Sequence, residues 1–355
     1  MQKTKNTTNW PLVGNEQVGE FFLKSVRKGN ISGTYIFSGP ADLGKTTAAK
    51  FFAKILLCDN VNKPNAKLPC EACPSCRKMT LNPLDGKKEK INLSGRHGDL
   101  LILKKDPEKK NISIGEIREF IKRMQMGSFL GNYKVGIIKD ADCLSTEAAS
   151  ALLKTLEEPK KKVVIILTVT DMEKLLPTIL SRSQVLYFSP AKPGLVHDFL
   201  IKEYGIGRSA AKNLSRLALG RPALARKFLQ DKDFYDNYLE IAGQFLKILP
   251  ANINSRLAIV DKLFNSKKNS GQAGVRDVGR ILEIWQGLVR DLILEELGQS
   301  DLVQHEVKAD EIKAAKKNLS LPKLAKLLAS LKKGRAYLDA NVNPKLVLEE
   351  IVINI

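Results

Sequence analysis

A glycine-rich segment near the N-terminus has the composition and spacing of a phosphate-binding loop. Residues 39–46 read GPADLGKT, which fits the pattern G-x-x-x-x-G-K-[ST] between a strand-like and a helix-like segment. The glycines let backbone N–H groups surround a phosphate, and a helix that begins there adds partial positive charge. We expect Lys45 to reach the β- and γ-phosphates of a nucleotide and the Thr46 hydroxyl to ligate Mg²⁺. The nucleotide-binding set is Gly39, Gly44, Lys45, Thr46 and Thr47.

Four cysteines follow the loop at a spacing typical of a metal site. The four are Cys58, Cys70, Cys73 and Cys76, the last three within the segment CEACPSC. Four thiolates match a tetrahedral Zn²⁺ site, and a closed set leaves no coordination position for a substrate water, so the metal would be structural. An iron–sulfur cluster uses similar ligands, and cysteines without any metal are the third alternative. Cys143 stands apart and is interpreted as an inert buried thiol.

A positive charge stands where a P-loop nucleotidase usually carries a carboxylate. In such enzymes the strand facing the phosphates ends with an aspartate that holds Mg²⁺ through water, whereas here the apolar segment 135–138 is followed by Lys139 and Asp140. Two unit charges about 4 Å apart interact by roughly 4 kcal/mol at an intermediate dielectric constant, so Lys139 would weaken a metal site. Asp140 could order a water, but only as a weak base. The alternative is that Lys139 turns away and Asp140 or Asp142 takes the metal.

The elements that must position these residues alternate through the first half of the chain. Strand-like apolar segments occur at 34–39, 99–105, 135–138 and 163–169, and helix-like segments at 45–58, 113–126 and 145–159 separate them. This alternation predicts an α/β fold, a parallel sheet with helices on both faces. Beyond 188–194, which holds two prolines and a glycine, every periodic segment is helical. We predict three domains: an α/β P-loop domain at 1–189 with a zinc-binding insertion at 58–76, a small all-α domain at 190–232, and an all-α domain at 233–355.

The totals bound the class of protein. The chain has 355 residues, a formal net charge of +20 and a pI near 9.6, and this surplus favours a polyanionic partner such as nucleic acid. A solvated lysine-rich surface is the alternative, and we favour water for most of the lysine-rich stretches at 104–110, 160–162, 266–268 and 313–333. The strongest apolar run, 163–169, is far shorter than the roughly 20 residues that cross a bilayer, and the N-terminus lacks a secretory signal. We therefore expect a cytoplasmic protein with reduced cysteines and no membrane partner.

Several segments together resemble the AAA+ clamp-loader subunits of bacterial DNA polymerase III. The segments are the P-loop with its four-cysteine insertion, EAASALLKTLEEP at 147–159, TDMEKLLPTILSRS at 170–183 and ANVNPKLVLE at 340–349. The resemblance runs from Trp10 to the C-terminus. It implies a nucleotide-binding domain, a lid and a helical collar, within a pentameric complex that uses ATP to place a sliding clamp on primed DNA. The implied partners are the tau/gamma and delta subunits and, through the complex, the clamp and the DNA.

Two branches of that family carry the zinc insertion, the tau/gamma motor and delta prime. The motor usually has an aspartate followed by a glutamate at the strand end, where this chain has Lys139 and Asp140. This chain is also expected to lack a tail of the kind that tau has. The resemblance therefore favours the delta prime branch, whose members hydrolyse ATP poorly or not at all, and the tau/gamma motor is the alternative. A P-loop protein whose zinc module reads DNA directly is a third interpretation, but the module has few aromatic residues for base stacking.

The resemblance also implies roles for two further residues. Arg182 occupies the arginine of the family's Ser-Arg-Cys motif, an arginine finger that reaches the γ-phosphate in the adjacent subunit, although Ser183 replaces the cysteine. A solvated surface arginine is the alternative. Thr170 occupies the sensor position after the segment 163–169, where a hydroxyl can contact the γ-phosphate or the attacking water. His97, His197 and His305 have no ligand-like neighbours in the sequence, so no chemistry is assigned to them.

Overall fold

A computed structural model gives the arrangement of the chain, and it divides into two compact units. Unit 1 comprises residues 1–195 with 221–223, and unit 2 comprises 196–220 with 224–355. The structure describes residues 10–80, 93–94, 97–106, 108–129, 132–158, 160–265, 271–316 and 319–355. Pro159, the expected stop of one helix, and the lysines at 266–268 lie outside these ranges.

Unit 1 is built on a six-stranded sheet in the order β2-β3-β4-β5-β1-β6. The strands are β1 (Thr34–Ser38), β2 (Leu93–Ser94), β3 (Leu100–Leu103), β4 (Lys134–Ile138), β5 (Val163–Val169) and β6 (Gln184–Tyr187). All neighbouring pairs are parallel except β2 and β3. The prediction of a parallel sheet is confirmed, and its four expected strands correspond to β1, β3, β4 and β5.

Strand β6 is missing from the strands expected from the sequence. It pairs with β1 and occupies one edge of the sheet. Both end residues, Gln184 and Tyr187, are exposed, and the two residues between them are only half-buried. An edge strand with one neighbour buries little, so its four residues show neither the continuous apolar run nor the alternation that identifies a strand in the sequence.

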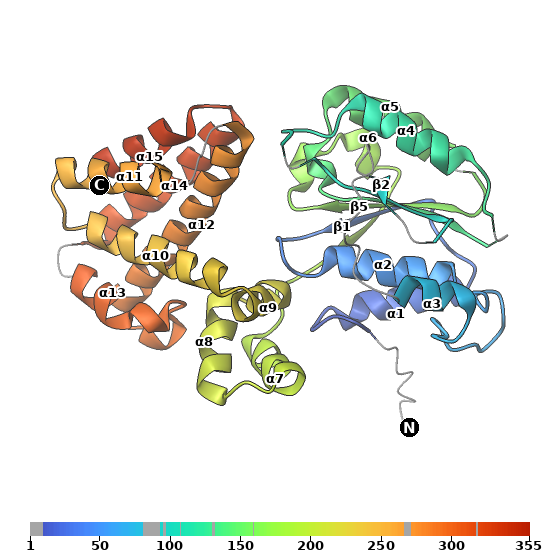
Figure 1. Ribbon diagram of the computed structural model, residues 1–355, viewed down its shortest axis with the longest axis horizontal. Helices are drawn as coiled ribbons and strands as arrows, with labels where there is room; N and C mark the ends of the chain where they lie inside the picture. Colours follow the sequence, from blue (N-terminus) through green and yellow to red (C-terminus); the bar gives the residue numbers. More distant parts are fainter. Residues whose placement is uncertain are drawn as a thin grey trace. The chain divides into compact units, whose positions relative to one another are not determined.

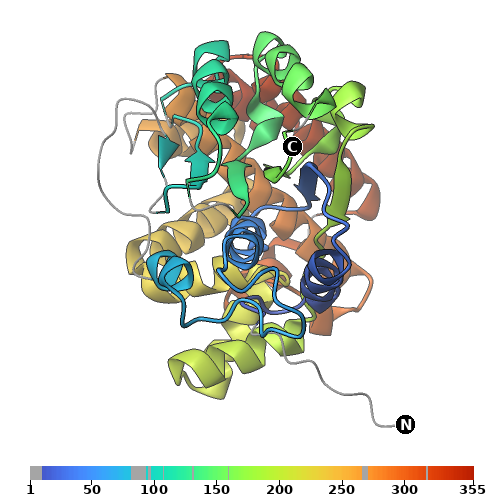
Figure 2. The same cartoon turned by 90° about the vertical axis from the view of Figure 1, so that its right-hand side faces the viewer.

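Helices cover both faces of this sheet (Figures 1 and 2). Helices α1 (Glu16–Arg27), α2 (Lys45–Leu56) and α3 (Pro74–Thr80) lie on one side, and α4 (Ile114–Gln125), α5 (Thr146–Glu157) and α6 (Pro177–Leu180) lie on the other. Ser113 begins α4 in a capping box with Glu116, and the expected cap Ser145 accepts a hydrogen bond from the Ala148 N–H at the start of α5.

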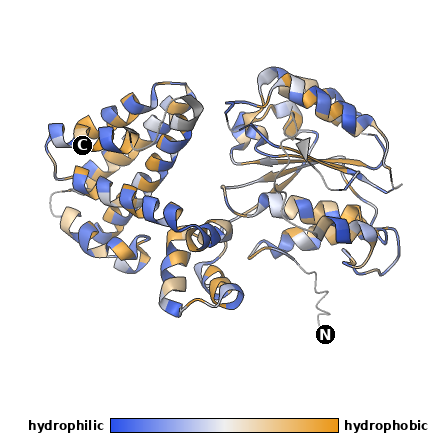
Figure 3. Cartoon of the chain, in the orientation of Figure 1, coloured by the Kyte–Doolittle hydropathy of each residue, from blue (hydrophilic) through white to orange (hydrophobic). Residues whose placement is uncertain are grey.

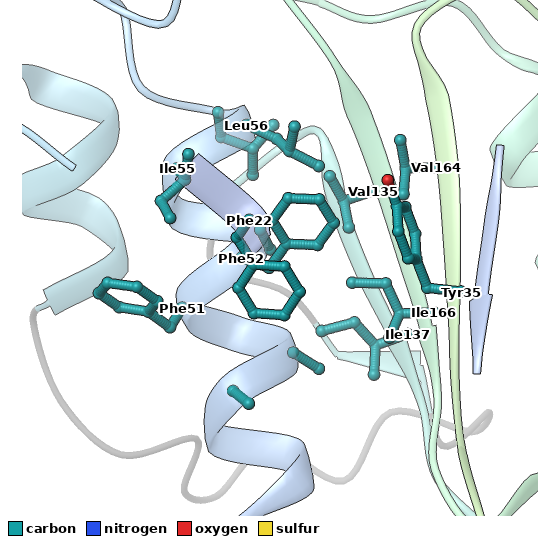
Figure 4. Close-up of a cluster of buried hydrophobic side chains, with 14 of the residues drawn as sticks. Phe22, Tyr35, Phe51, Phe52, Ile55, Leu56, Val135, Ile137, Val164 and Ile166 are labelled. Atoms are coloured by element: carbon teal, nitrogen blue, oxygen red, sulfur yellow. The ribbon is translucent and has the colours of Figure 1, made fainter. Parts of the chain in front are cut away.

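The alternation of side chains along the strands divides the core of unit 1 into two layers. Val135 and Ile137 of β4 face α1 and α2, where Phe22 and Phe52 stack with their ring centroids 4.2 Å apart (Figure 4). Ile138, the next residue of β4, belongs instead to the layer under α4 and α5. Successive side chains of a strand point to opposite faces, so this register also fixes the face on which any residue after the strand end lies.

Gly136 of β4 provides a test of this packing. A Cβ at this position would lie 2.4 Å from Phe120 Cζ and 2.9 Å from Met124 Sδ of α4. We expect Gly136→Ala to lower the free energy of unfolding by about 1–3 kcal/mol because it overpacks the core, measured by urea denaturation. Gly115→Ala is the control, since a Cβ there meets nothing within 4 Å and alanine favours the helix α4. Equal stability of Gly136→Ala and the parent chain would contradict this packing.

The described residues of unit 2 form helices and the turns and loops that join them, without a strand. Its helices are α7 (Pro193–Tyr204), α8 (Arg208–Ala218), α9 (Pro222–Gln230), α10 (Lys232–Ile248), α11 (Ile253–Asn265), α12 (Gly271–Glu296), α13 (Ala309–Lys316), α14 (Leu321–Asp339) and α15 (Pro344–Ile353), with the first residues of α7 and α9 falling in unit 1. Hydrophobic and hydrophilic residues alternate along these helices, as expected for helices that bury one face (Figure 3). The helical second half expected from the sequence is confirmed.

A buried polar network joins α8, α10 and α12 of unit 2. His305 and Asp291 are completely buried, with His305 Nδ1 2.7 Å from Asp291 Oδ2 and His305 Nε2 2.8 Å from the Tyr238 hydroxyl. Asp291 also accepts the backbone N–H groups of Gln304 and His305, and Gln304 Nε2 donates to the Leu217 carbonyl of α8 at 2.9 Å. His305 therefore has two polar partners, 14 and 67 residues away in sequence, which local spacing could not reveal.

Candidate functional site

The predicted phosphate loop lies between the carboxyl end of β1 and the first turn of α2. Strand β1 lies between β5 and β6, and the loop follows its carboxyl end. This is the topological switch point of the sheet, where ligands of such folds usually bind. Gly39 and Gly44 have φ values of 148° and 88°. A Cβ on Gly39 would lie 2.3 Å from the Phe188 carbonyl oxygen. Glycine is therefore required there because it has no side chain and because it can adopt a positive φ.

Lys45 lies inside this loop. It is only 8% exposed, and its Nζ donates to the carbonyl oxygens of Gly39 at 2.5 Å and Pro40 at 2.6 Å. Burial lowers the pKa of Lys45, while the carboxylates of Asp142, Asp140 and Asp42 act in the opposite direction. Thr46 and Thr47 follow in the same helical turn, half-buried and exposed respectively. The loop and the first turn of α2 thus bring the five predicted nucleotide-binding residues together.

The carboxyl ends of β4 and β5 bring Asp140, Asp142 and Thr170 together. Asp140 adopts the left-handed conformation with φ 55°, and its backbone N–H donates to Thr168 Oγ1 at 3.3 Å. Asp142 Oδ2 accepts hydrogen bonds from the Thr170 hydroxyl, the Thr170 N–H at 3.2 Å and the Asp171 N–H at 3.3 Å. Within the described residues, the other oxygen of Asp142 is buried without a hydrogen-bond partner.

Asp142 therefore makes more contacts in this site than its local sequence predicts. The sequence pattern offers it only as a second choice for the metal. Its carboxylate nevertheless binds the Thr170 hydroxyl, and it raises the pKa of Lys45 more than the other carboxylates do. The signal that identifies it is its position on the turn Ala141–Cys143 directly after β4, opposite the end of β5.

Lys139 follows β4, and its charge acts on Lys50 of α2. Its N–H donates to the Leu103 carbonyl at 2.9 Å, which extends the pairing of β3 and β4 by one step. Burial lowers the pKa of Lys50 on α2, and the charges of Lys104 and Lys139 lower it further. Of the charged groups at this strand end, Asp140 and Asp142 are the ones whose carboxylates raise the pKa of Lys45 against the effect of burial.

Arg182 follows helix α6 and is partly exposed. Its Nη2 lies 3.1 Å from Glu157 Oε1 of α5, and its Nη1 donates to the Thr178 carbonyl at 3.1 Å. Its side chain keeps 39% of its surface exposed, so the guanidinium is held at the surface of unit 1 by a single carboxylate.

The four cysteines converge into one cluster at the end of α2. Their sulfur atoms all lie within 4.8 Å of one another, with Cys58 Sγ 4.0 Å from Cys73 Sγ and Cys70 Sγ 3.9 Å from Cys76 Sγ. A Zn–S bond of about 2.3 Å in a tetrahedral site requires sulfur atoms about 3.8 Å apart. The donor set and its spacing fit one Zn²⁺ ion, whereas a cluster of several irons and sulfides would hold the thiolates further apart.

Local contacts fix the loops that carry these thiols. The N–H groups of Cys73 and Cys76 donate to the sulfurs of Cys70 and Cys73, each at 3.4 Å. Burial raises the pKa of the thiols of Cys58 and Cys76. Burial acts in the same direction on Cys70, but N–H groups of the Cys73 and Ala72 backbone and the adjacent thiols lower its pKa to about 6. One thiol of the set is thus prepared as a thiolate, and the others would ionise on binding a cation.

Two contacts secure the cluster to unit 1. Lys54 of α2 forms an ion pair with Glu71, and the Ser75 hydroxyl donates to Asp59 Oδ1 at 2.6 Å. Cys143 lies outside the cluster, and burial raises the pKa of its thiol, in keeping with an inert side chain.

Several lysines of the surplus have partners within the chain. Lys160 donates to the Gln125 carbonyl at 3.0 Å, Lys316 lies 3.1 Å from a Glu296 carboxylate oxygen, and Lys333 lies 3.8 Å from one of Glu350. Within the described residues, no helix is long and apolar enough to cross a membrane.

Comparisons with known proteins agree with this architecture. The chain is 24% identical to DNA polymerase III subunit delta' of Bacillus subtilis over 95% of its own length and 94% of the relative's. It is 32% identical to DNA polymerase III subunit tau of the same organism over 49% of its length, but this covers only 27% of the tau protein. It is also 32% identical to subunit delta' of Pseudomonas aeruginosa over 42% of its length and 40% of the relative's.

A solved structure shares the fold along nearly the whole chain. A DNA polymerase III gamma subunit-related protein of Thermotoga maritima superposes with a TM-score of 0.51 at 19% identity, covering 95% of this chain and 97% of that one. The sequence profile of the family described as "DNA polymerase III, delta subunit" matches residues 14–192, the segment that contains the phosphate loop, the cysteine cluster and Arg182. Because this match covers just over half of the 355 residues, the chain belongs to the DNA polymerase III, delta subunit family.

Proposed function

We propose that this chain is a clamp-loader subunit of the delta prime type, a stator in the DNA polymerase III complex that places a sliding clamp on primed DNA. The observation that carries the proposal is the extent of the alignments. The delta' protein of Bacillus subtilis aligns over 95% of this chain, whereas the tau protein of that organism aligns over only 49% of it. The direct partners proposed are the tau/gamma and delta subunits, with the clamp and the primed DNA reached through the complex in the cytoplasm.

The proposed division of labour follows the three expected segments. Residues 1–189 form the AAA+ P-loop domain, 190–232 the lid and 233–355 the collar that joins the ring. Residues 196–220 and 224–355 form one compact unit, so the lid would belong mechanically with the collar. The module at 58–76 would hold structural Zn²⁺ through Cys58, Cys70, Cys73 and Cys76, which the donor spacing supports.

The phosphate loop is proposed to bind ATP with Mg²⁺ but to hydrolyse it poorly. Gly39, Gly44, Lys45, Thr46 and Thr47 would hold the phosphates. No carboxylate is available at position 139, and Asp140 is exposed. Asp142 Oδ2 already accepts three hydrogen bonds, which leaves the buried Oδ1 as the oxygen of Asp142 without one among the described residues. A metal held by so few free oxygens would position the attacking water badly. Thr170 would act as the sensor and Asp140 as a weak base.

The experiment that tests the stator uses a loader in which only this chain can hydrolyse ATP. The tau/gamma subunits would carry a substitution of their own P-loop lysine, and this chain would be unchanged. We expect single-turnover hydrolysis per site to be at least about 10³-fold slower than in the unmodified loader, because metal and water are poorly held. Rapid-quench measurement of phosphate release checks this.

The control combines those substitutions with Lys45→Ala in this chain, which should remove the remaining hydrolysis. A rate comparable to that of the motor subunits would instead establish the second candidate, a tau/gamma-type ATPase. That candidate is favoured by one observation, the proximity of the Asp142 and Asp140 carboxylates to Lys45.

A further inference from the structure

We propose that Lys50, Lys104 and Lys139 form a binding site for a phosphate group, separate from the phosphate loop and on the face of the sheet that α2 covers. The site goes beyond the proposed function, because neither a stator nor a motor requires it. It also accounts for the cation at the end of β4.

The strand register places Lys104 and Lys139 side by side. Leu103 of β3 pairs with Ile138 of β4, and the Lys139 N–H donates to the Leu103 carbonyl at 2.9 Å, so the two lysines are the next pair in register. Both residues before them, Leu103 and Ile138, face the layer under α4 and α5. Alternation therefore directs both lysine side chains to the opposite face, toward α2.

Lys50 approaches this pair from α2. Its charged neighbours are Lys104 and Lys139, which together with burial lower the pKa of its ammonium. All three side chains belong to half-buried residues. In the part of the chain that the structure describes, none of the three ammonium groups forms an ion pair or a hydrogen bond.

Neighbouring lysines on the same helix are arranged differently. Lys54, one turn beyond Lys50, forms an ion pair with Glu71, and the charges around Lys45 are the carboxylates of Asp142, Asp140 and Asp42. Acidic groups are thus available at both ends of α2 but are not used at Lys50, where only cations converge.

Three ammonium groups on half-buried residues repel one another when no counter-charge is present, and a bound anion would add an attractive interaction with each of them. A phosphate has several oxygens that accept charge-assisted hydrogen bonds, and a dianion offsets most of three positive charges. Lys50 lies about 7.5 Å along the helix axis from Lys45 at 1.5 Å per residue, so the group bound here is distinct from one at the helix start. It can be inorganic phosphate or a phosphate of a second nucleotide that binds outside the phosphate loop.

The binding experiment removes the phosphate loop as a competitor. The full chain with Lys45→Ala would be titrated with inorganic phosphate at constant ionic strength and followed by calorimetry. We expect saturable binding at one site, weakened about tenfold or more by adding Lys139→Gln or Lys104→Gln. Lys105→Gln is the matched control, since Lys105 is adjacent in sequence but acts on Cys143, and it should change the affinity less than about twofold.

A second measurement leaves the phosphate loop intact and identifies the source. If a phosphate of a second nucleotide occupies the site, the unmodified chain binds two ATP molecules, and Lys139→Gln weakens the second about tenfold and leaves the first unchanged. If both forms bind a single ATP equally well, inorganic phosphate alone is the ligand, provided that the Lys45→Ala titration saturates. The proposal is overturned if that titration shows no saturable binding and ATP affinity is also unchanged, or if Lys105→Gln weakens binding as much as Lys139→Gln.

Thermal melting without phosphate provides a check that does not depend on Lys45→Ala folding. Removing one cation from a repelling set should raise the melting temperature of the Lys139→Gln chain at low salt, and Lys105→Gln should not. A lower melting temperature for Lys139→Gln would contradict the convergence of the three charges. None of these outcomes depends on whether the chain acts as a stator, so the two proposals can fail separately.

Discussion

Arg182→Ala is expected to slow ATP hydrolysis by about 10³-fold or more at the neighbouring site that receives the guanidinium, in a loader assembled with tau/gamma and delta. The positive charge of an arginine finger offsets the negative charge that develops on the γ-phosphate in the transition state. A single-turnover burst should therefore lose the amplitude of one site, while the other sites keep their rate.

The surroundings of Arg182 explain how it could reach a neighbour. It is held by Glu157 and the Thr178 carbonyl at the surface, and a partly exposed ion pair of this kind is worth about 0–1 kcal/mol. Exchanging Glu157 for a phosphate in an adjacent subunit therefore costs little. Glu157→Gln should leave the burst intact or make it faster.

The matched control is Arg123→Ala on α4. Arg123 is also partly exposed and also pairs with a glutamate, Glu119, at 2.8 Å, but it lies outside the segment implied to reach the neighbouring site. A loader that contains Arg123→Ala should show the full burst amplitude. An intact complex with the full burst from Arg182→Ala would remove the arginine finger from the proposed function.

The second large effect concerns the cysteine cluster. Cys76→Ser, or removal of the metal with a chelator, is expected to lower the melting temperature of the chain by at least about 10 °C. Structural zinc contributes directly to folding, and Cys76 is a completely buried member of the core that contains α1 and α2. Calorimetric melting before and after chelation checks the effect, and re-addition of Zn²⁺ should restore it.

Cys143→Ser is the control for that experiment, since it changes the same atom in a half-buried residue outside the cluster. It should melt within about 2 °C of the parent chain and should keep one bound zinc. Substitution with Co²⁺ gives an independent reading, because four thiolates produce strong sulfur-to-metal charge-transfer absorption. Unchanged melting of Cys76→Ser together with absent cobalt absorption would show that these thiols bind no metal.

The sequence predicts best where chemistry is local. The phosphate loop is a continuous segment whose glycines have a geometric reason at each position, and three of the four clustered thiols lie within seven residues, so both could be identified before any fold was known. The buried strands of the parallel sheet were likewise visible as continuous apolar runs.

What the sequence could not give is the direction of side chains brought together from distant elements. Lys139 stands at the expected strand end, and its charge acts on Lys50, because the pleat of β4 directs it to the α2 face. Lys104 and Lys50 come from another strand and a helix, so no local pattern joins them to Lys139. The partners of His305 are distant for the same reason.

The network around Asp291 limits where a chimera between this protein and a relative can be joined. The Leu217 carbonyl of α8 accepts a hydrogen bond from Gln304 Nε2. Side-chain nitrogens of Lys212 and Arg216, on the same helix, each lie 2.9 Å from a carboxylate oxygen of Glu306. A chimera joined near residue 232 would separate Gln304 and Glu306 from these partners on α8, whereas Asp291, Tyr238 and His305 would stay together. Inheritance of residues 196–355 as one block would keep all of these contacts, so crossovers belong upstream of α8.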